Sequence, residues 1–337
     1  MDQFILKSLL FEYEKKRNYA EILAEDKKRE LYQKYSKLQE LDDLLTSLAI
    51  STTKNLIINS NNQDLLENLQ QQIENLKKEK KKLLNSIGLS EDYFLPKYEC
   101  TNCNDTGYIT NPDYTTHMCN CLKQKIYDME YNKSNIYHLE KQNFEQFSNL
   151  LYSDEINEEK YHSKISPRKN IELIKNICNQ FISNFDDPNE KNLLFTGSTG
   201  LGKTFLSSCI ANELIKKNKN VLYQTSPIML DMIIDYRFDK NNKNKDMYNS
   251  LLNVDLLIID DLGTECMNNM KFTELFNIIN TRLLNQNKVT KTIISTNLSI
   301  KNLYDTYDER IVSRIVGNYH LCYFFGEDIR FKKRIIY

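Results

Sequence analysis

The sequence predicts an α/β fold in which a parallel sheet flanked by helices occupies the C-terminal half of the chain. After Lys191, apolar runs of strand length alternate with helical patterns, as in a parallel sheet that is covered on both faces. The first part of the chain has no Gly before Gly88 and no Pro before Pro96, and its apolar residues recur at helical intervals. Between these parts lies a segment of turn-forming residues that carries a cluster of cysteines.

These changes of character divide the 337 residues into four predicted parts. They are a helical or coiled-coil region at 1–92, a knuckle module at 93–125, a helical linker at 126–165 and the α/β domain at 166–337. A chain of this length usually builds about two cores. With 40% hydrophobic and 27% charged residues, the composition is that of a soluble globular protein.

The charge and hydropathy patterns bear on location and partners. Residues 1–190 carry a net charge of about −6 and residues 191–337 about +5, which is too modest to identify a nucleic-acid partner by itself. Charged residues interrupt the first fifteen positions, so no signal peptide is expected. No apolar stretch has the length of a membrane span. We therefore expect a cytoplasmic protein that does not bind membranes.

The N-terminal region contains one clear heptad-like seam. Its apolar positions follow three- and four-residue steps, with Lys80 in the one polar slot, and are Leu66, Leu69, Ile73, Leu76, Leu83 and Ile87. Such a seam needs a partner, which can be the earlier helical stretch 5–50 folded back or a helix of another protein. The charged run 77–82 is expected on the solvated faces, with nucleic-acid contact as the alternative.

The module at 93–125 contains four cysteines at knuckle spacing. They form two close pairs separated by fifteen residues, Cys100 with Cys103 and Cys119 with Cys121. Four thiolates at this spacing predict a tetrahedral, structural Zn²⁺ site. Two alternatives stay open, a redox dithiol and a site in which His117 replaces one thiolate. The four scattered cysteines of the second half, Cys178, Cys209, Cys266 and Cys322, are expected to pack as small apolar residues.

The α/β domain opens with a helix and a phosphate-binding loop. Ser166 and Pro167 predict the start of a helix that runs to about residue 185, with Pro at its first position. The loop follows the strand-like run 193–196 and comprises Gly197, Ser198, Thr199, Gly200, Leu201, Gly202, Lys203 and Thr204. Its glycines let backbone N–H groups turn toward phosphates, and the next helix presents its positive end to them. The alternative is a glycine-rich turn without a ligand.

Within this loop, Lys203 is expected to contact the outer phosphates of ATP and Thr204 to give its hydroxyl to Mg²⁺. A second apolar strand, 256–260, ends in two carboxylates. Asp260 would complete the Mg²⁺ site, and Asp261 would polarise the attacking water. Because Asp261 is shorter than the Glu that many related ATPases have there, Glu265 remains the alternative for this role.

A third strand, 292–296, is followed by Asn297, whose amide can hold the water or sense the terminal phosphate. Beyond it lie two arginines in a helical pattern, Arg310 and Arg314. Arg314 is the first candidate for an arginine that a neighbouring subunit supplies to the transferring phosphoryl group, with Arg310 second. The alternative is a surface arginine paired to Asp308 or Glu309. Arg330 is a further candidate phosphate sensor.

With these motifs in hand, the chain resembles the bacterial DnaC/DnaI family of replicative-helicase loaders, which are AAA+ ATPases. The likeness covers the helical N-terminus, the cysteine knuckles, the phosphate loop, the carboxylate and amide strands and the segment 325–330. It is closest to the zinc-containing DnaI-like branch. Because the sequence ends soon after the fifth predicted strand, at 321–325, we expect the small helical lid of many AAA+ proteins to be missing or vestigial.

The resemblance implies an ATPase with ATP, Mg²⁺ and Zn²⁺ as cofactors and with slow, partner-stimulated turnover. It also implies that the N-terminal region grips the hexameric replicative helicase, while the AAA+ domain self-associates, uses Arg314 in trans and helps to place the helicase on single-stranded DNA. Two other functions remain open. One is an IstB-like transposition helper, which the knuckles and the helical N-terminus disfavour, and the other is a nucleotide-binding adaptor with little turnover. A replication initiator would need a duplex-binding helix-turn-helix after the ATPase core, and we do not expect one here.

Overall fold

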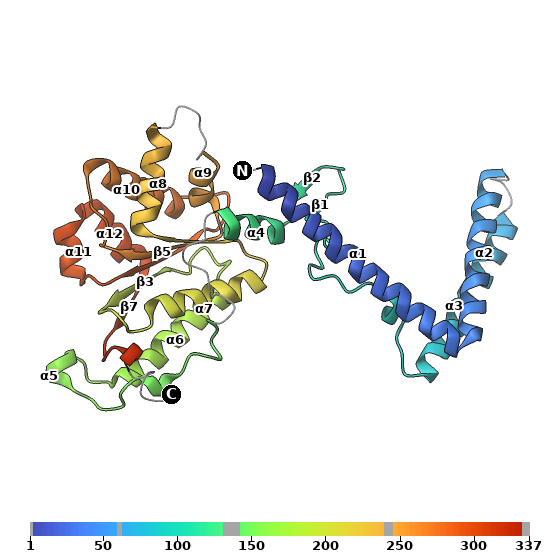
Figure 1. Ribbon diagram of the computed structural model, residues 1–337, viewed down its shortest axis with the longest axis horizontal. Coiled ribbons are helices and arrows are strands. Elements are labelled where there is room, and N and C mark those ends of the chain that lie inside the picture. Colours follow the sequence, from blue (N-terminus) through green and yellow to red (C-terminus); the bar gives the residue numbers. More distant parts are fainter. Residues whose placement is uncertain (1–2, 59–62, 131–141, 239–244, 332–337) are drawn as a thin grey trace. The chain divides into compact units, whose positions relative to one another are not determined.

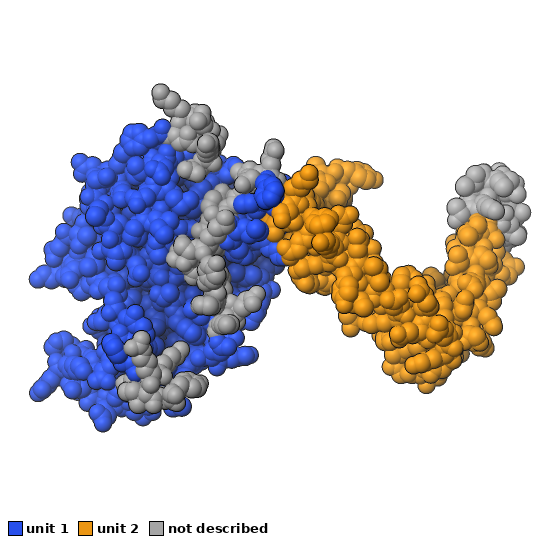
Figure 2. All heavy atoms as spheres, viewed as in Figure 1, with its two compact units in different colours: residues 1–6, 118–337 blue, residues 7–117 orange. Residues whose placement is uncertain are grey.

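The structure of the protein is a computed structural model that describes residues 3–58, 63–130, 142–238 and 245–331 (Figure 1). The chain forms two compact units (Figure 2). One comprises residues 7–117, and the other comprises residues 118–337 together with residues 1–6. None of the described helices combines the length and the apolar character that a membrane span requires.

Three long helices begin the chain: α1 (Gln3–Lys34), α2 (Ser36–Ile58) and α3 (Gln63–Ser86). Helix α3 packs against α2, around a buried cluster of Leu31, Leu38 and Leu84. The polar slot of the predicted seam is also satisfied, because Lys80 forms an ion pair with Asp42 of α2. The expected partner of the seam is therefore the preceding helical stretch of the same chain.

The predicted linker is only partly helical. The module before it contains the 3-10 turn η1 (Glu91–Phe94) and the paired short strands β1 (Tyr108–Thr110) and β2 (Thr116–Met118), and helix α4 (Asn120–Glu130) follows. Residues 131–141 lie outside the described part of the chain. From 142 to 165, the structure has the 3-10 turn η3 (Asn149–Leu151) and the one-turn helix α5 (Glu158–Tyr161), joined by turns and irregular backbone, where the sequence predicts a helical linker.

Helix α6 (Pro167–Ser183) begins where Ser166 and Pro167 predict a helix start. Ser166 is its N-cap, and the Ser166 hydroxyl accepts a hydrogen bond from the Lys169 N–H, which satisfies one of the free donors at the helix start. Five strands follow in the sequence order β3 (Asn192–Gly197), β4 (Val221–Thr225), β5 (Leu256–Leu262), β6 (Lys291–Thr296) and β7 (Tyr319–Phe324). They form a parallel sheet in the spatial order β4-β5-β6-β3-β7.

Helices cover both faces of this sheet, because the strand residues alternate between two buried clusters. Leu193, Ile258 and Ile293 pack with α6 and α7 (Lys203–Lys216), while Leu194 and Leu257 face the other side. That second side is covered by α8 (Ser226–Phe238), α9 (Lys245–Asn253), α10 (Asn269–Leu283), α11 (Ile300–Thr306) and α12 (Glu309–Asn318). Burial on both faces explains why the strands are apolar along almost their whole length.

At one edge of the sheet, helix α4 lies against strand β4. The side-chain amide of Gln124 accepts a hydrogen bond of 2.7 Å from the Val221 N–H and donates one of 3.0 Å to the Val221 carbonyl. Gln124 thus supplies the two hydrogen bonds that a neighbouring strand would otherwise form with the backbone of Val221. The buried amide fastens α4 to the α/β domain.

Candidate functional site

The phosphate loop connects β3 to the N-terminus of α7, at the carboxyl end of the sheet where ligands of parallel α/β folds bind. Its shape depends on glycine. Gly202 has φ +88°, and a Cβ atom there would lie 2.6 Å from the hydroxyl oxygen of Tyr152. That hydroxyl donates a 2.8 Å hydrogen bond to the Leu201 carbonyl, so Tyr152 supports the loop from outside the predicted motif.

A cavity of about 480 Å³ opens beside the loop. It is lined by Gln142, Thr199, Gly200, Leu201, Gly202, Lys203, Thr204, Phe205, Asp261, Thr264, Asn297, Ile329 and Arg330. Most of the predicted loop therefore meets Asp261 and Asn297 around one space, although these residues come from three separate parts of the sequence. The other predicted residues are not among those that line it: Gly197, Ser198, Asp260, Glu265 and Arg314.

Lys203 is the buried cation of this cavity. Its ammonium donates hydrogen bonds to the carbonyls of Gly197 at 2.6 Å and Ser198 at 2.8 Å, and to Asn297 Oδ1 at 2.8 Å. Burial is the main cause that lowers the pKa of Lys203 to about 8; the nearby Asp261 and Asp260 oppose this shift and Arg330 adds to it. A phosphate that arrives here would meet a lysine already held between the loop and the amide strand.

Asp260 ends the apolar part of β5, is 3% exposed, and is surrounded by hydroxyl groups. The Thr204 hydroxyl donates to its Oδ2 at 3.1 Å, the Tyr223 hydroxyl donates to the same oxygen, and the Ser295 hydroxyl donates to Oδ1. Thr204 belongs to the predicted phosphate loop, whereas no sequence pattern points to Tyr223 or Ser295. Only the register of β4, β5 and β6 brings these two residues to the carboxylate.

Asp260 and Thr204 together fit a Mg²⁺ site. Both present oxygen atoms, which are the ligands that Mg²⁺ prefers. Their hydrogen bond places the two predicted ligands side by side at the mouth of the phosphate loop. The donor chemistry and the closeness of the two groups fit this ion, and their roles as its ligands stay a prediction.

Asp261 adopts a left-handed backbone conformation with φ +55°, and its N–H donates to Ser295 Oγ at 3.1 Å. Burial and the neighbouring Asp260 raise the pKa of its carboxyl group, which lines the cavity. Left-handed backbone is tolerated by Asp and Asn better than by other side chains. The backbone at this turn therefore favours the short Asp over Glu.

Glu265, the alternative to Asp261, is engaged elsewhere. Its carboxylate accepts a 3.0 Å hydrogen bond from the Gly263 N–H and another from the Tyr307 hydroxyl. These contacts hold Glu265 against its own turn and against the end of α11. The geometry thus favours Asp261, which lines the cavity, over Glu265 as the candidate that polarises the attacking water.

The segment after β7 closes the loop from the other side. The Ile329 N–H donates to the Gly200 carbonyl at 2.9 Å. Gly200 has φ +74°, and a Cβ atom there would lie 2.0 Å from Asp328 Cγ. Asp328 in turn pairs with Arg330 at 2.9 Å, and the Arg330 side chain lines the cavity. Arg330, the further sensor candidate of the sequence, is therefore brought to the nucleotide site.

Arg314 and Arg310 lie on α12. Arg314 Nε donates to Asn280 Oδ1 at 2.7 Å, and its guanidinium lies 4.7 Å from the ring centroid of Phe276. Arg310 is exposed and pairs with Asp308 at 2.9 Å. The structure thus bears out the surface ion pair for Arg310, whereas Arg314 is held by a neutral amide and an aromatic ring. The role of Arg314 in a neighbouring subunit stays a prediction.

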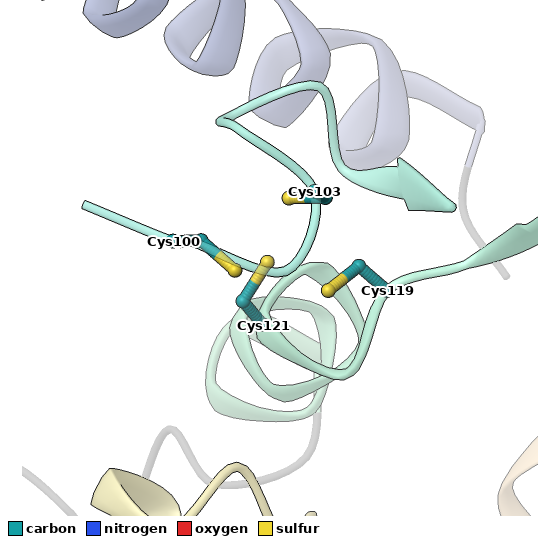
Figure 3. A group of neighbouring side chains, drawn as sticks. All are labelled: Cys100, Cys103, Cys119 and Cys121. Carbon is teal, nitrogen blue, oxygen red and sulfur yellow. The ribbon is translucent and has the colours of Figure 1, made fainter. Parts of the chain in front are cut away.

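The four clustered cysteines point toward one another (Figure 3). The sulfur atoms of Cys100, Cys103, Cys119 and Cys121 all lie within 4.8 Å of one another, as ligands of a single tetrahedral metal ion require. His117 is exposed, and the group found among the described residues consists of cysteines alone. The donor set and its closeness fit Zn²⁺ with four thiolates.

The turn that carries the first cysteine pair is shaped by Asp105. Its carboxylate accepts hydrogen bonds of 2.9 Å from the backbone N–H groups of Glu99 and Cys100. Asp105 itself has φ +54°, and Gly107 has φ +76°, which lets the chain leave the knuckle tightly. Asp105 lies outside the cysteine pattern, so the spacing of the cysteines does not predict its role.

Comparisons with known proteins agree with the nucleotide site. The profile of the family described as IstB-like ATP binding protein matches residues 146–335. The replicative helicase loader DnaC of Escherichia coli K12 is 28% identical over 140 residues, which is 41% of this chain and 56% of DnaC. A putative insertion sequence ATP-binding protein of Sinorhizobium fredii is 28% identical over 148 residues, which is 42% of this chain and 58% of that protein. The chain thus spans just over half the length of these curated relatives.

Two solved structures are similar in part. The crystal structure of the DnaC helicase loader has 26% sequence identity and a TM-score of 0.41, and the match covers 50% of this chain and 96% of that chain. The crystal structure of DnaI has 21% identity and a TM-score of 0.40, with 55% and 95% of the two chains covered.

Proposed function

The chain belongs to the family of IstB-like ATP-binding proteins, and from this premise we propose that it is a slow ATPase that loads the replicative helicase onto single-stranded DNA. The observation that carries the ATPase part is the convergence of Lys203, Thr204, Asp261 and Asn297 on one cavity, with Asp260 bonded to Thr204. The loader part is supported by the DnaC relatives and by the helical, cysteine-bearing N-terminal region.

In the proposed reaction, the backbone N–H groups of the loop and the start of α7 hold the phosphates of ATP. Lys203 contacts the outer phosphates, and Thr204 and Asp260 hold Mg²⁺, which neutralises phosphate charge when bound. Asp261 orients the attacking water, and Asn297 senses the terminal phosphate while steadying Lys203. Arg314 of a neighbouring subunit completes the site in the assembled state.

The N-terminal region offers a surface for the helicase. Helix α1 leaves Phe11, Tyr19 and Ile22 exposed at 58%, 64% and 58%, and their spacing places them along one face of the helix. A helix face of this kind can fit a hydrophobic groove on a partner. The contact with single-stranded DNA and a cytoplasmic location are proposed on the DnaC likeness alone.

Transposition is the second candidate function. It is favoured by the family itself and by the insertion-sequence relative from Sinorhizobium fredii. The long helical region and the cysteine cluster weigh against it, since the shared ATPase domain needs neither. The third candidate function is that of an adaptor that binds ATP and hardly hydrolyses it.

Affinity purification from cell extract distinguishes these functions. We expect the tagged full-length protein with ATP and Mg²⁺ to recover the replicative helicase. The matched variant Phe11→Ser with Ile22→Ser should recover much less while binding ATP equally well. Recovery of a transposase without the helicase would refute the loader function. Single-turnover hydrolysis with and without helicase and DNA then separates a stimulated ATPase from an adaptor.

A further inference from the structure

A tyrosine hydroxyl buried beneath the nucleotide site is not explained by packing. Tyr223 lies on edge strand β4, is 1% exposed, and belongs to the buried cluster between the sheet and helices α6 and α7. Its neighbours in that cluster are apolar, including Ile258, with which it pairs across the strands, and Leu206. A phenylalanine would suit such a position, because a buried hydroxyl needs a hydrogen-bond partner.

That partner is the carboxylate of Asp260. Tyr223 pairs with Ile258, and Asp260 lies two residues further along β5, so both side chains project from the same face of the sheet. A diagonal pair of this kind is within reach of a long aromatic side chain. The Tyr223 hydroxyl reaches Asp260 Oδ2 and lies close enough to interact with Thr204 as well.

Strand β6 supplies the opposite contact. Ser295 donates to Asp260 Oδ1, while its oxygen accepts the N–H of Asp261. Tyr223 of β4 and Ser295 of β6 therefore donate hydrogen bonds to the two oxygens of the Asp260 carboxylate on β5. The carboxylate is also 3% exposed, so bulk water contributes little to fixing its orientation.

We propose that Tyr223 is a positioning residue, which orients the Asp260 carboxylate so that this carboxylate and the Thr204 hydroxyl together present their oxygens to Mg²⁺. The inference rests on the proposed nucleotide site and names a residue that acts on the metal through Asp260. Tyr223 itself is not among the residues that line the cavity, and its hydroxyl donates to Asp260.

The test is Tyr223→Phe, which removes the hydroxyl and keeps the ring in the cluster. Binding of a fluorescent, non-hydrolysable ATP analogue is measured in EDTA and across a Mg²⁺ titration. We expect binding in EDTA to stay within about twofold of wild type, while the Mg²⁺ concentration at half-saturation rises roughly tenfold, since a hydrogen bond to a buried charged group is lost. The thermal midpoint is recorded for both proteins.

Tyr319→Phe is the matched control. It removes another buried tyrosine hydroxyl from the same sheet, at the start of edge strand β7, where the side chain lies near Arg282. Its Mg²⁺ titration should coincide with that of wild type. A change shared by both variants would mean that the effect is general weakening of the sheet, which would overturn the inference.

Two other results would overturn it. One is a Tyr223→Phe variant that binds Mg²⁺ as well as or better than wild type. The other is a variant whose nucleotide binding weakens equally with and without Mg²⁺. If wild type itself shows no Mg²⁺-dependent nucleotide binding, the proposed function fails and the role of Tyr223 falls with it. If wild type binds nucleotide in a Mg²⁺-dependent way and Tyr223→Phe shows the same dependence, only the role of Tyr223 is refuted and the proposed function stands.

Discussion

Raising the pH from 7 to 9 should weaken ATP binding through a single group, Lys203. In the nucleotide-free protein, burial lowers the pKa of this lysine to about 8, well below its usual 10.5. Its ammonium is held by the carbonyls of Gly197 and Ser198 and by the Asn297 amide, which carry no full charge. A bound triphosphate would place negative charge beside the ammonium and raise its pKa again.

The size of the effect follows from this pKa. The charged fraction of Lys203 falls from about nine-tenths at pH 7 to about one-tenth at pH 9. If the charged form alone makes the phosphate contact, ATP affinity falls roughly tenfold over this range, or about 1.4 kcal/mol. At pH 8, binding should take up about half a proton per site, because the bound lysine is fully protonated.

Calorimetry at saturating Mg²⁺ tests both numbers, since titrations in two buffers of different ionisation enthalpy give the proton uptake directly. Lys203→Arg is the matched control, because an arginine stays charged throughout the range. Its affinity can be lower overall but should not change between pH 7 and pH 9. A flat wild-type affinity, or an equal slope in the arginine variant, would contradict the reasoning.

Three further predictions concern separate parts of the chain. Arg314→Ala should leave ATP binding intact and lower hydrolysis at least tenfold only in the assembled state, measured by single-turnover assays, because its guanidinium would act on a neighbouring subunit. Metal analysis should find about one zinc per chain, and Cys100→Ser should lose most of it, because one of four thiolates is removed. Gln124→Ala should lower the free energy of unfolding of the α/β domain by about 1–3 kcal/mol in urea, because both backbone groups of Val221 lose their partner.

Each of these has a matched comparison. Arg310→Ala removes an exposed arginine of the same helix and should leave assembled hydrolysis near wild type, and equal loss in isolated monomers of the Arg314 variant would argue against action in trans. Protein without metal and with a Cys100–Cys103 disulfide would favour the redox alternative. Met129→Ala, on an exposed turn of α4, should leave the urea midpoint unchanged. An equal shift of the urea midpoint in Met129→Ala would contradict the claim that the hydrogen bonds of Gln124 stabilise the α/β domain.

Much of the α/β domain could be predicted because its signals are local. The buried strands are continuously apolar, and the Ser166 cap and the glycine loop are short motifs whose geometry follows from backbone chemistry. The DnaC relatives confirm the expected resemblance, although the zinc-containing branch remains a prediction. The expected pairing of the N-terminal seam was also correct, since apolar periodicity is local as well.

The contacts around Asp260 could not be read in this way. Tyr223, Ser295 and Asp260 are separated by 35 residues or more, and their meeting depends on the order and register of three strands. Asp261 has a left-handed backbone and its N–H donates to Ser295 of another strand, and no dipeptide pattern marks this turn. The expected helical linker is mostly turns and irregular backbone at 142–165, where no capping or periodic signal distinguishes a helix from an ordered turn that packs on a neighbouring loop.

The amide of Gln124 has a consequence for the behaviour of the protein in concentrated solution. A parallel sheet ends in a strand whose backbone can recruit a strand from another molecule, and such recruitment leads to aggregates. On β4, the glutamine occupies both hydrogen-bonding groups of Val221, and α4 covers the adjoining backbone. Strand addition by another copy is therefore blocked at Val221.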